Sequence, residues 1–134
     1  RAGYATRPPE LPDAHALSAT RERKYVGLPR GDLPRAESLE ECLERVVPVF
    51  QERILQDLDE GLDVVVVAHG NSLRALIKHF DGLSDEEIVG LNLPTGVPIV
   101  YDVDADGRPA NRRFLGDQDA IAAEMEAVRN QTKG

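Results

Sequence analysis

The sequence predicts an α/β fold whose sheet is incomplete within these 134 residues. Four consecutive valines at 64–67 are typical of a strand that is buried on both faces, and a tight turn leads from them into a helical pattern at Leu73. Only two weaker strand patterns follow, at 97–103 and 111–115. Because a buried parallel strand needs neighbours on both edges, we expect other segments of the same protein, or a partner, to complete the sheet.

The first 36 residues carry no hydrophobic period. Pro8, Pro9 and Pro12 exclude a regular helix or a central strand there, although a short helical turn is expected around 18–24. An irregular segment of this length in a compact domain is often a functional lid, and a solvated surface loop is an equally good interpretation. We predict a single domain over residues 1–134, with a lid-like segment at 1–36 and an α/β portion at 37–134.

The α/β portion opens with a long amphipathic helix, predicted over 39–59. Ser38 and Glu41 form a capping box at its start, and Gly61 closes it. Pro48 lies inside the helix and should kink it, because proline lacks the backbone donor. The apolar side chains that recur at helical spacing are Leu39, Cys42, Leu43, Val46, Val47, Phe50, Ile54 and Leu58.

The last third of the chain predicts a short helix, a hairpin and a final helix. A second capping box begins at Ser84 and opens a helix that ends near Gly90. Turn residues at 104–107 then join the two weaker strands into a hairpin. An Ala-rich helix is expected over 118–129, with an apolar face that includes Ile121, Met125 and Val128.

Composition limits the classes of partner. A net charge of −8 with no basic stripe argues against a nucleic-acid backbone, but it leaves room for a small anionic ligand held by local Arg and His side chains. No apolar run reaches the length of a membrane span, and no signal peptide is visible. Cys42 is the single cysteine, so an intramolecular disulfide is excluded and a reducing cytosolic compartment fits.

His69 is the histidine with a positional argument for function. It follows the valine run, at the carboxyl edge of a predicted strand, where open α/β sheets bind ligands. Gly70 lets the backbone approach a ligand closely, and Asn71 or Ser72 can cap the next helix, whose N-terminus favours an anion. The pattern predicts a phosphate site in which His69 acts as a general acid or base, or hydrogen-bonds a transferring phosphoryl group.

Other chemistries are weakly supported. His15 and His79 are expected at the surface, and Ser72 lacks the Gly-x-Ser-x-Gly setting of a hydrolase nucleophile. No histidine or cysteine spacing predicts a metal site, and no glycine-rich nucleotide loop is present. A group of basic residues in the lid-like segment has two interpretations, surface charge or contacts to phosphate and carboxylate groups: Arg1, Arg7, Arg21, Arg23 and Lys24.

Several motifs together resemble a known family. The chain is similar to the cofactor-dependent phosphoglycerate mutases of the histidine phosphatase superfamily in its residues 1–4, 8–11, 36–39, 68–76, 84–88 and 91–101. The resemblance covers nearly the whole chain and implies the C-terminal part of a three-layer α/β/α phosphoglycerate mutase-like fold. The rest of that fold would supply the first strands of the sheet.

The resemblance also implies an activity. Such enzymes interconvert 3-phosphoglycerate and 2-phosphoglycerate in glycolysis and gluconeogenesis, through a phosphohistidine that 2,3-bisphosphoglycerate primes, without a metal. His69 matches the histidine that stabilises the transferring phosphoryl group, and Gly70 and Asn71 match a pair that binds substrate phosphate. Arg1 matches the first of two substrate-binding arginines, whereas Ala2 stands where the second is usual. A cytoplasmic homodimer or homotetramer acting on phosphoglycerates, with no nucleic-acid or membrane partner, is expected.

Two departures qualify this expectation. The family's N-terminal Arg-His-Gly motif, which carries the phosphoacceptor histidine, and its acid–base glutamate have no counterpart in these residues. We therefore expect this chain alone to be inactive, as the C-terminal half of an enzyme. The alternatives are a phosphatase of the same superfamily and a non-catalytic phosphate-binding fragment.

Overall fold

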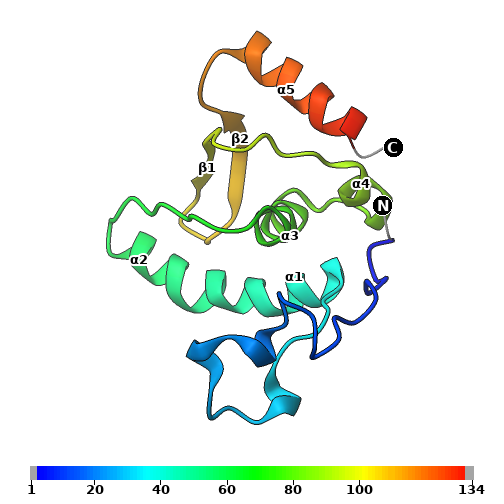
Figure 1. The fold of residues 1–134 in the computed structure, drawn as a ribbon. Coiled ribbons are helices and arrows are strands. Elements are labelled where there is room, and N and C mark those ends of the chain that lie inside the picture. The colour runs from blue at the N-terminus through cyan, green and yellow to red at the C-terminus, as the bar shows by residue number, and fades with distance from the viewer. Residues whose placement is uncertain (1–2, 132–134) are drawn as a thin grey trace.

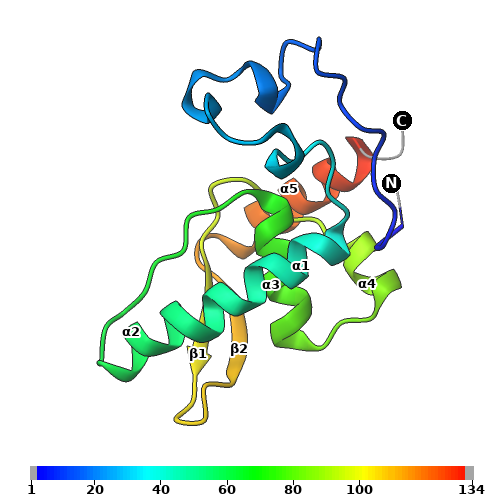
Figure 2. The ribbon, with the colours of Figure 1, turned by 90° about the horizontal axis from the view of Figure 1, so that it is seen from below.

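A computed structural model describes residues 3–131. Helices α1 and α3 pack together on one side of a two-stranded hairpin, and α5 lies on the other side (Figure 1). The segment of residues 3–37 runs along the outside of α1 (Figures 1 and 2). The elements are α1 (Leu39–Val49), a π-helical turn (Phe50–Ile54), α2 (Leu55–Asp59), α3 (Gly70–Asp81), α4 (Asp85–Gly90), β1 (Ile99–Val103), β2 (Pro109–Phe114) and α5 (Gln118–Gln131).

The predicted long helix is confirmed as a single path made of three parts. Its capping box is present: Ser38 Oγ accepts the Glu41 N–H at 3.2 Å, and a Glu41 carboxylate oxygen accepts the Ser38 N–H at 2.9 Å. Pro48 lies within α1, and the π-helical turn follows it before regular geometry resumes in α2. The irregularity lies where a missing backbone donor disturbs the ladder of hydrogen bonds. Figure 2 shows this path crossing α3.

The core lies between α1, α3 and α4. Ile88 and Ala75 are fully buried, and the Cys42 side chain faces inward from α1 as its helical spacing predicts. Aromatic rings extend the core to the hairpin, with centroid distances of 4.6 Å from Phe50 to Phe80 and 5.0 Å from Phe80 to Tyr101. These contacts fix α3, which positions the candidate site, against both neighbouring layers.

The predicted hairpin is confirmed. Strands β1 and β2 pair antiparallel, from Ile99 opposite Phe114 to Val103 opposite Pro109, with an irregularity near Asp102. The turn is closed by Asp104, whose carboxylate accepts the backbone N–H groups of residues 106 and 108 at 2.9 and 2.8 Å. Tyr101 then donates its hydroxyl to Asp81 at 3.0 Å, which ties the hairpin to the end of α3.

The predicted valine strand is not found, and its predicted burial is wrong for this chain. Residues 62–69 form no strand within the described part of the molecule; they run as an unpaired connection from α2 to α3 (Figure 1). Val65 is 86% exposed and Val67 is 92% exposed. The physical reason is that a strand needs a neighbour for its N–H and C=O groups, and in the described residues the only two strands pair with each other.

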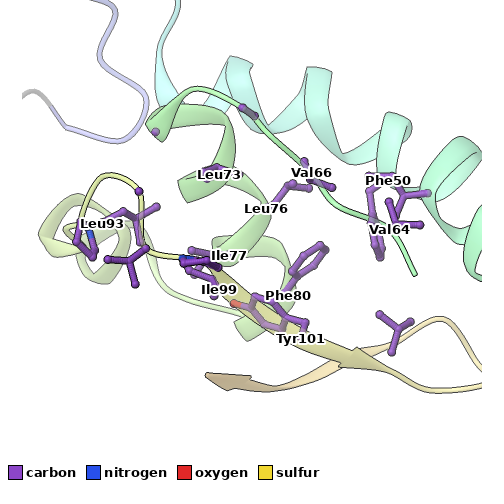
Figure 3. A pocket seen from close by; sticks show the side chains of 18 of the residues that line it. Phe50, Val64, Val66, Leu73, Leu76, Ile77, Phe80, Leu93, Ile99 and Tyr101 are labelled. Atoms are coloured by element: carbon purple, nitrogen blue, oxygen red, sulfur yellow. The ribbon is translucent and has the colours of Figure 1, made fainter. Parts of the chain in front are cut away.

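An apolar groove of about 360 Å³ separates this valine segment from β1. Figure 3 shows Val64 and Val66 on one wall, and Ile99 and Tyr101 on the other. The floor comes from α3 and the π-helical turn and includes Leu73, Leu76, Ile77, Phe80 and Phe50. The hairpin and the valine segment therefore lie over the same helical layer without meeting.

The remaining elements agree with the sequence predictions in kind. The lid-like segment contains three short 3-10 turns, at Ala19–Arg21, Arg23–Tyr25 and Arg30–Asp32. Both α4, with its capping box, and α5 lie where they were expected; Ile121 is buried and Met125 half-buried, while the side chain of Val128 lies outside the described residues. Among the described residues, no helix is both long and apolar enough to cross a membrane.

Candidate functional site

His69 begins the candidate site by capping α3. Its backbone is extended, and its Nδ1 accepts the N–H of Asn71 at 3.2 Å. The prediction that Asn71 or Ser72 would cap this helix was wrong, because the imidazole nitrogen takes the acceptor role that a short polar side chain usually fills. With Nδ1 as an acceptor, the proton of the neutral ring belongs on Nε2. The ring can then donate one hydrogen bond to an anionic oxygen.

The residues after His69 leave the N-terminus of α3 accessible. His69, Gly70 and Asn71 are all exposed, and a Cβ atom built on Gly70 would meet no atom within 4 Å. The glycine is therefore not required by packing within this chain. Backbone N–H groups in the first turn of a helix lack partners within the helix and carry its positive end, so this turn suits an anion.

A second hollow, of about 240 Å³, lies beside this turn. Its lining comes from segments that are far apart in sequence: Gly3, Tyr4, Thr6 and Pro8 from the N-terminal segment, Glu37 just before α1, Leu39 from its first turn, Asn71 and Arg74 from α3, and Val89 from α4. We call it the Asn71 cavity. It differs from the groove of Figure 3 in having polar and charged lining groups next to the helix N-terminus.

Arg74 is a member of this site that the sequence analysis did not single out. Its guanidinium donates to the Ile88 carbonyl and, at 3.4 Å in each case, to the Val89 carbonyl and to Asn71 Oδ1. These bonds hold the end of α4 against α3. The signal was present in the sequence, because Arg74 stands three residues after Asn71 and so shares its face of the helix.

Cys42 lies beneath the same turn. The residue is 1% exposed, and its thiol lies 3.9 Å from Ser72 Oγ. Burial raises the pKa of the Cys42 thiol, which keeps it protonated and unreactive near neutral pH. We assign Cys42 to the packing of α1 against α3 rather than to chemistry.

The predicted site residues divide into three groups. His69, Gly70 and Asn71 come together at the start of α3, whereas Arg1 and Ala2 lie outside the described residues. Two basic side chains of the lid-like segment bind groups within that segment: Arg21 donates to the Ala14 carbonyl, and Lys24 forms an ion pair with Glu22. His15 and His79 are exposed, as predicted.

The described residues also hold no cluster of three or more His, Cys, Asp or Glu side chains arranged to bind a metal ion.

The comparisons with known proteins identify the class to which this fold and site belong. The family model of the histidine phosphatase superfamily (branch 1) matches residues 10–113, and the chain belongs to this superfamily. Within it, the chain is 46% identical, over 135 aligned residues, to a 2,3-bisphosphoglycerate-dependent phosphoglycerate mutase of Streptomyces avermitilis. The match covers 99% of this chain and 53% of that protein, so the chain spans about half the length of the curated relative.

These findings confirm the family resemblance and the fold class. The structure is a partial α/β phosphoglycerate mutase-like fold, with helices on both sides of a two-stranded sheet. The strand shortage that the sequence predicts is also found, since the described sheet contains β1 and β2 alone.

Proposed function

We propose that this chain is part of an enzyme that interconverts 3-phosphoglycerate and 2-phosphoglycerate through a phosphohistidine. The identity to the Streptomyces avermitilis mutase supports the reaction. The observation that carries the proposal is the hydrogen bond from the Asn71 N–H to His69 Nδ1, because it leaves Nε2–H to donate to a phosphoryl oxygen beside a helix N-terminus. His69 is then the catalytic residue in this chain, and the phosphoacceptor histidine lies outside it.

Substrate binding would use the turn after His69. Gly70 and Asn71 would bind the substrate phosphate at the N-terminus of α3, where their exposure gives an anion access. Arg1 would bind the substrate's anionic groups; it lies outside the described residues, so its resemblance to the family alone supports this role. Arg74, on the cavity wall, would hold α4 against α3 at the edge of the substrate site.

The proposed primer is 2,3-bisphosphoglycerate, which the name of the Streptomyces avermitilis relative includes. Its anionic groups fit the donor set here: an imidazole N–H, an exposed helix N-terminus and open space at Gly70. When bound, it supplies the phosphoryl group that the enzyme exchanges with substrate. His69 and the turn after it would orient an anionic group, and no metal takes part in the proposal.

We further propose that strands from the rest of the enzyme fill the groove between the valine segment and β1. The groove has an apolar helical floor, and its two edges are unpaired in the part of the chain that the structure describes, which is the environment that an extended strand requires. Residues 1–134 would then be the C-terminal portion of one domain and inactive alone. As a glycolytic and gluconeogenic enzyme, the whole protein would act in the cytoplasm, as a homodimer or homotetramer.

Two other functions remain for the test to decide. A phosphatase of the same superfamily would transfer the phosphoryl group to water, and the family match alone fits that chemistry. A non-catalytic phosphate-binding fragment would bind phosphoglycerates without turning them over. The Pro-rich opening and the loop at 91–98 favour the mutase.

The experiment compares the complete polypeptide that contains this sequence with the 134-residue chain. Isomerisation of 3-phosphoglycerate is measured with and without 2,3-bisphosphoglycerate, and phosphate release is measured in parallel. We expect primed isomerisation by the complete polypeptide and none by the chain alone. Net phosphate release would favour the phosphatase, and binding without turnover would favour the non-catalytic fragment.

The role of His69 is tested by His69→Asn, because asparagine is a good helix cap and preserves the start of α3. We expect kcat to fall about 10²- to 10³-fold, as when a donor to a developing oxyanion is lost. His15→Asn is the matched control: His15 Nδ1 also accepts the N–H two residues on, at 3.2 Å, in the lid-like segment. Equal effects of the two substitutions would contradict the assignment.

A further inference from the structure

Arg7 is bound by Glu41, 34 residues further along the chain. Its Nε lies 2.7 Å from both carboxylate oxygens of Glu41, and its Nη2 also contacts the carboxylate. The same carboxylate completes the capping box of α1 by accepting the Ser38 N–H. The Arg7 guanidinium, together with Ser38, lowers the pKa of Glu41 to about 2, so the carboxylate is charged throughout the neutral range.

Two more contacts fix the segment that precedes Arg7. The Tyr4 carbonyl accepts the N–H of Glu40 at 3.3 Å, which joins the segment to the first turn of α1. The Tyr4 ring lies under Lys78, with Nζ 4.6 Å from the ring centroid. Lys78 is itself held in place, because it pairs with Asp85 at 2.9 Å and its side chain is only 13% exposed.

These anchors determine one wall of the Asn71 cavity. The segment of residues 3–8 has no regular secondary structure, so no ladder of backbone hydrogen bonds sets its position. Its residues Gly3, Tyr4, Thr6 and Pro8 line the cavity that Asn71 and Arg74 line from α3. If the segment moved away from α1, this wall of the cavity would move with it.

We propose that Arg7 and Glu41 are positioning residues, whose ion pair holds residues 3–8 as a wall of the Asn71 cavity and so sets its affinity for a phosphorylated substrate. Arg7 acts through Glu41 and does not bind the substrate. The inference rests on the proposed function for the identity of that substrate. It replaces both of the sequence-based interpretations of Arg7, surface charge and direct contact with phosphate or carboxylate.

The test uses Arg7→Gln and Glu41→Gln in the complete polypeptide. Glutamine suits the third position of a capping box, so Glu41→Gln removes the ion pair and retains the helix cap. We expect each substitution to raise KM for 3-phosphoglycerate about two- to fivefold, the range that an exposed ion pair provides, with kcat within about twofold of wild type. The double variant should be no worse than either single one, and Arg7→Lys should restore part of the affinity.

Glu87→Gln is the matched control, since Glu87 completes the same capping box in α4 and no arginine pairs with it among the described residues. It should leave KM unchanged. If Arg7 bound substrate directly, Arg7→Gln would raise KM, while Glu41→Gln would leave it unchanged or lower it. That result, or an unchanged KM in both variants of an active enzyme, would overturn the inference.

A second measurement separates this inference from the proposed function. Hydrogen exchange at the Glu40 amide, which donates to Tyr4, should accelerate in Arg7→Gln and Glu41→Gln and stay at the wild-type rate in Glu87→Gln. Unchanged exchange would show that the pair does not hold the segment. If the wild-type protein neither binds nor isomerises phosphoglycerate, the proposed function fails, and exchange still decides whether Arg7 and Glu41 hold residues 3–8.

Discussion

Two regions of the described chain have strand-like sequences: the hairpin of β1 and β2, and the valine segment of residues 62–69. The first forms a sheet and the second does not. Strand β1 and the valine segment are both rich in β-branched residues. The hairpin is paired and packed on α3, whereas Val65 and Val67 are almost fully exposed. The difference is the distance along the chain to a partner: a short turn closed by Asp104 brings β2 to β1, whereas no segment among residues 3–131 pairs with the valines.

The comparison teaches that apolar β-branched sequence specifies where a strand belongs and does not by itself form one. Hydrogen-bond partners and a covered face are also required. The valine segment has a covered face but, among the described residues, no strand that pairs with it: Val64 and Val66 line the groove over α3, while Val65 and Val67 face solvent. This alternation is what one covered face and one open face produce.

The largest expected effect comes from comparing Ile77→Ala with Val65→Ala in the 134-residue chain. Ile77 is 3% exposed in the core, so its truncation should lower the free energy of unfolding by about 2–5 kcal/mol. Val65 is 86% exposed, and its truncation should change that free energy by less than about 0.5 kcal/mol. Urea denaturation measures both, and equal losses would contradict the exposed valine segment.

An intermediate effect is expected from Gly107→Ala in the hairpin turn. Gly107 has φ 76°, and an added Cβ would lie 3.1 Å from a methyl carbon of Leu55. The substitution should lower the free energy of unfolding by about 1–3 kcal/mol, because an L-residue is strained there. Gly90→Ala is the control, since that helical position has open space; it should be neutral or stabilising by up to about 1 kcal/mol. A hairpin that tolerated Gly107→Ala would not depend on its turn as described.

The smallest expected effect is the pH dependence of a cross-strand pair. Arg113 Nη1 lies 2.9 Å from Asp102 Oδ1, and its hydrogen bond lowers the pKa of Asp102 below its ordinary value of 3.8. A lowered pKa means that the pair stabilises the hairpin above about pH 3.8, and that this contribution is lost as the pH falls through the folded-state pKa. The Tm difference between wild type and Asp102→Asn should therefore be present at pH 7 and shrink below pH 4. A difference that grew on acidification would contradict this pairing.

Local signals made most of the fold predictable. Both capping boxes and the hairpin turn depend on residues within a few positions of each other, and the helices and hairpin strands that they begin or join lie within a few residues of their predicted bounds. The pattern around His69 and Gly70 likewise predicted that a helix begins shortly after the histidine. Its capping role was missed because imidazole is an uncommon cap.

Long-range features could not be obtained from local pattern. The pair of Arg7 and Glu41 joins residues 34 positions apart, and nothing near either residue signals the other. The exposure of Val65 depends on a neighbour that the described chain does not supply. In both cases a local pattern can indicate that a residue needs a partner, an opposite charge for Arg7 or a neighbouring strand for Val65. Only the three-dimensional arrangement shows whether that partner is present.

The most direct test of this account is amide hydrogen exchange along residues 64–68, measured in the 134-residue chain and in the complete polypeptide that contains it. We predict fast exchange in the chain, faster than in β1, and strong protection in the complete polypeptide, where a strand inserted in the groove would accept these N–H groups. Protection of these amides already in the isolated chain, or fast exchange in both proteins, would contradict the claim that the valine segment is an unpaired strand of an incomplete sheet.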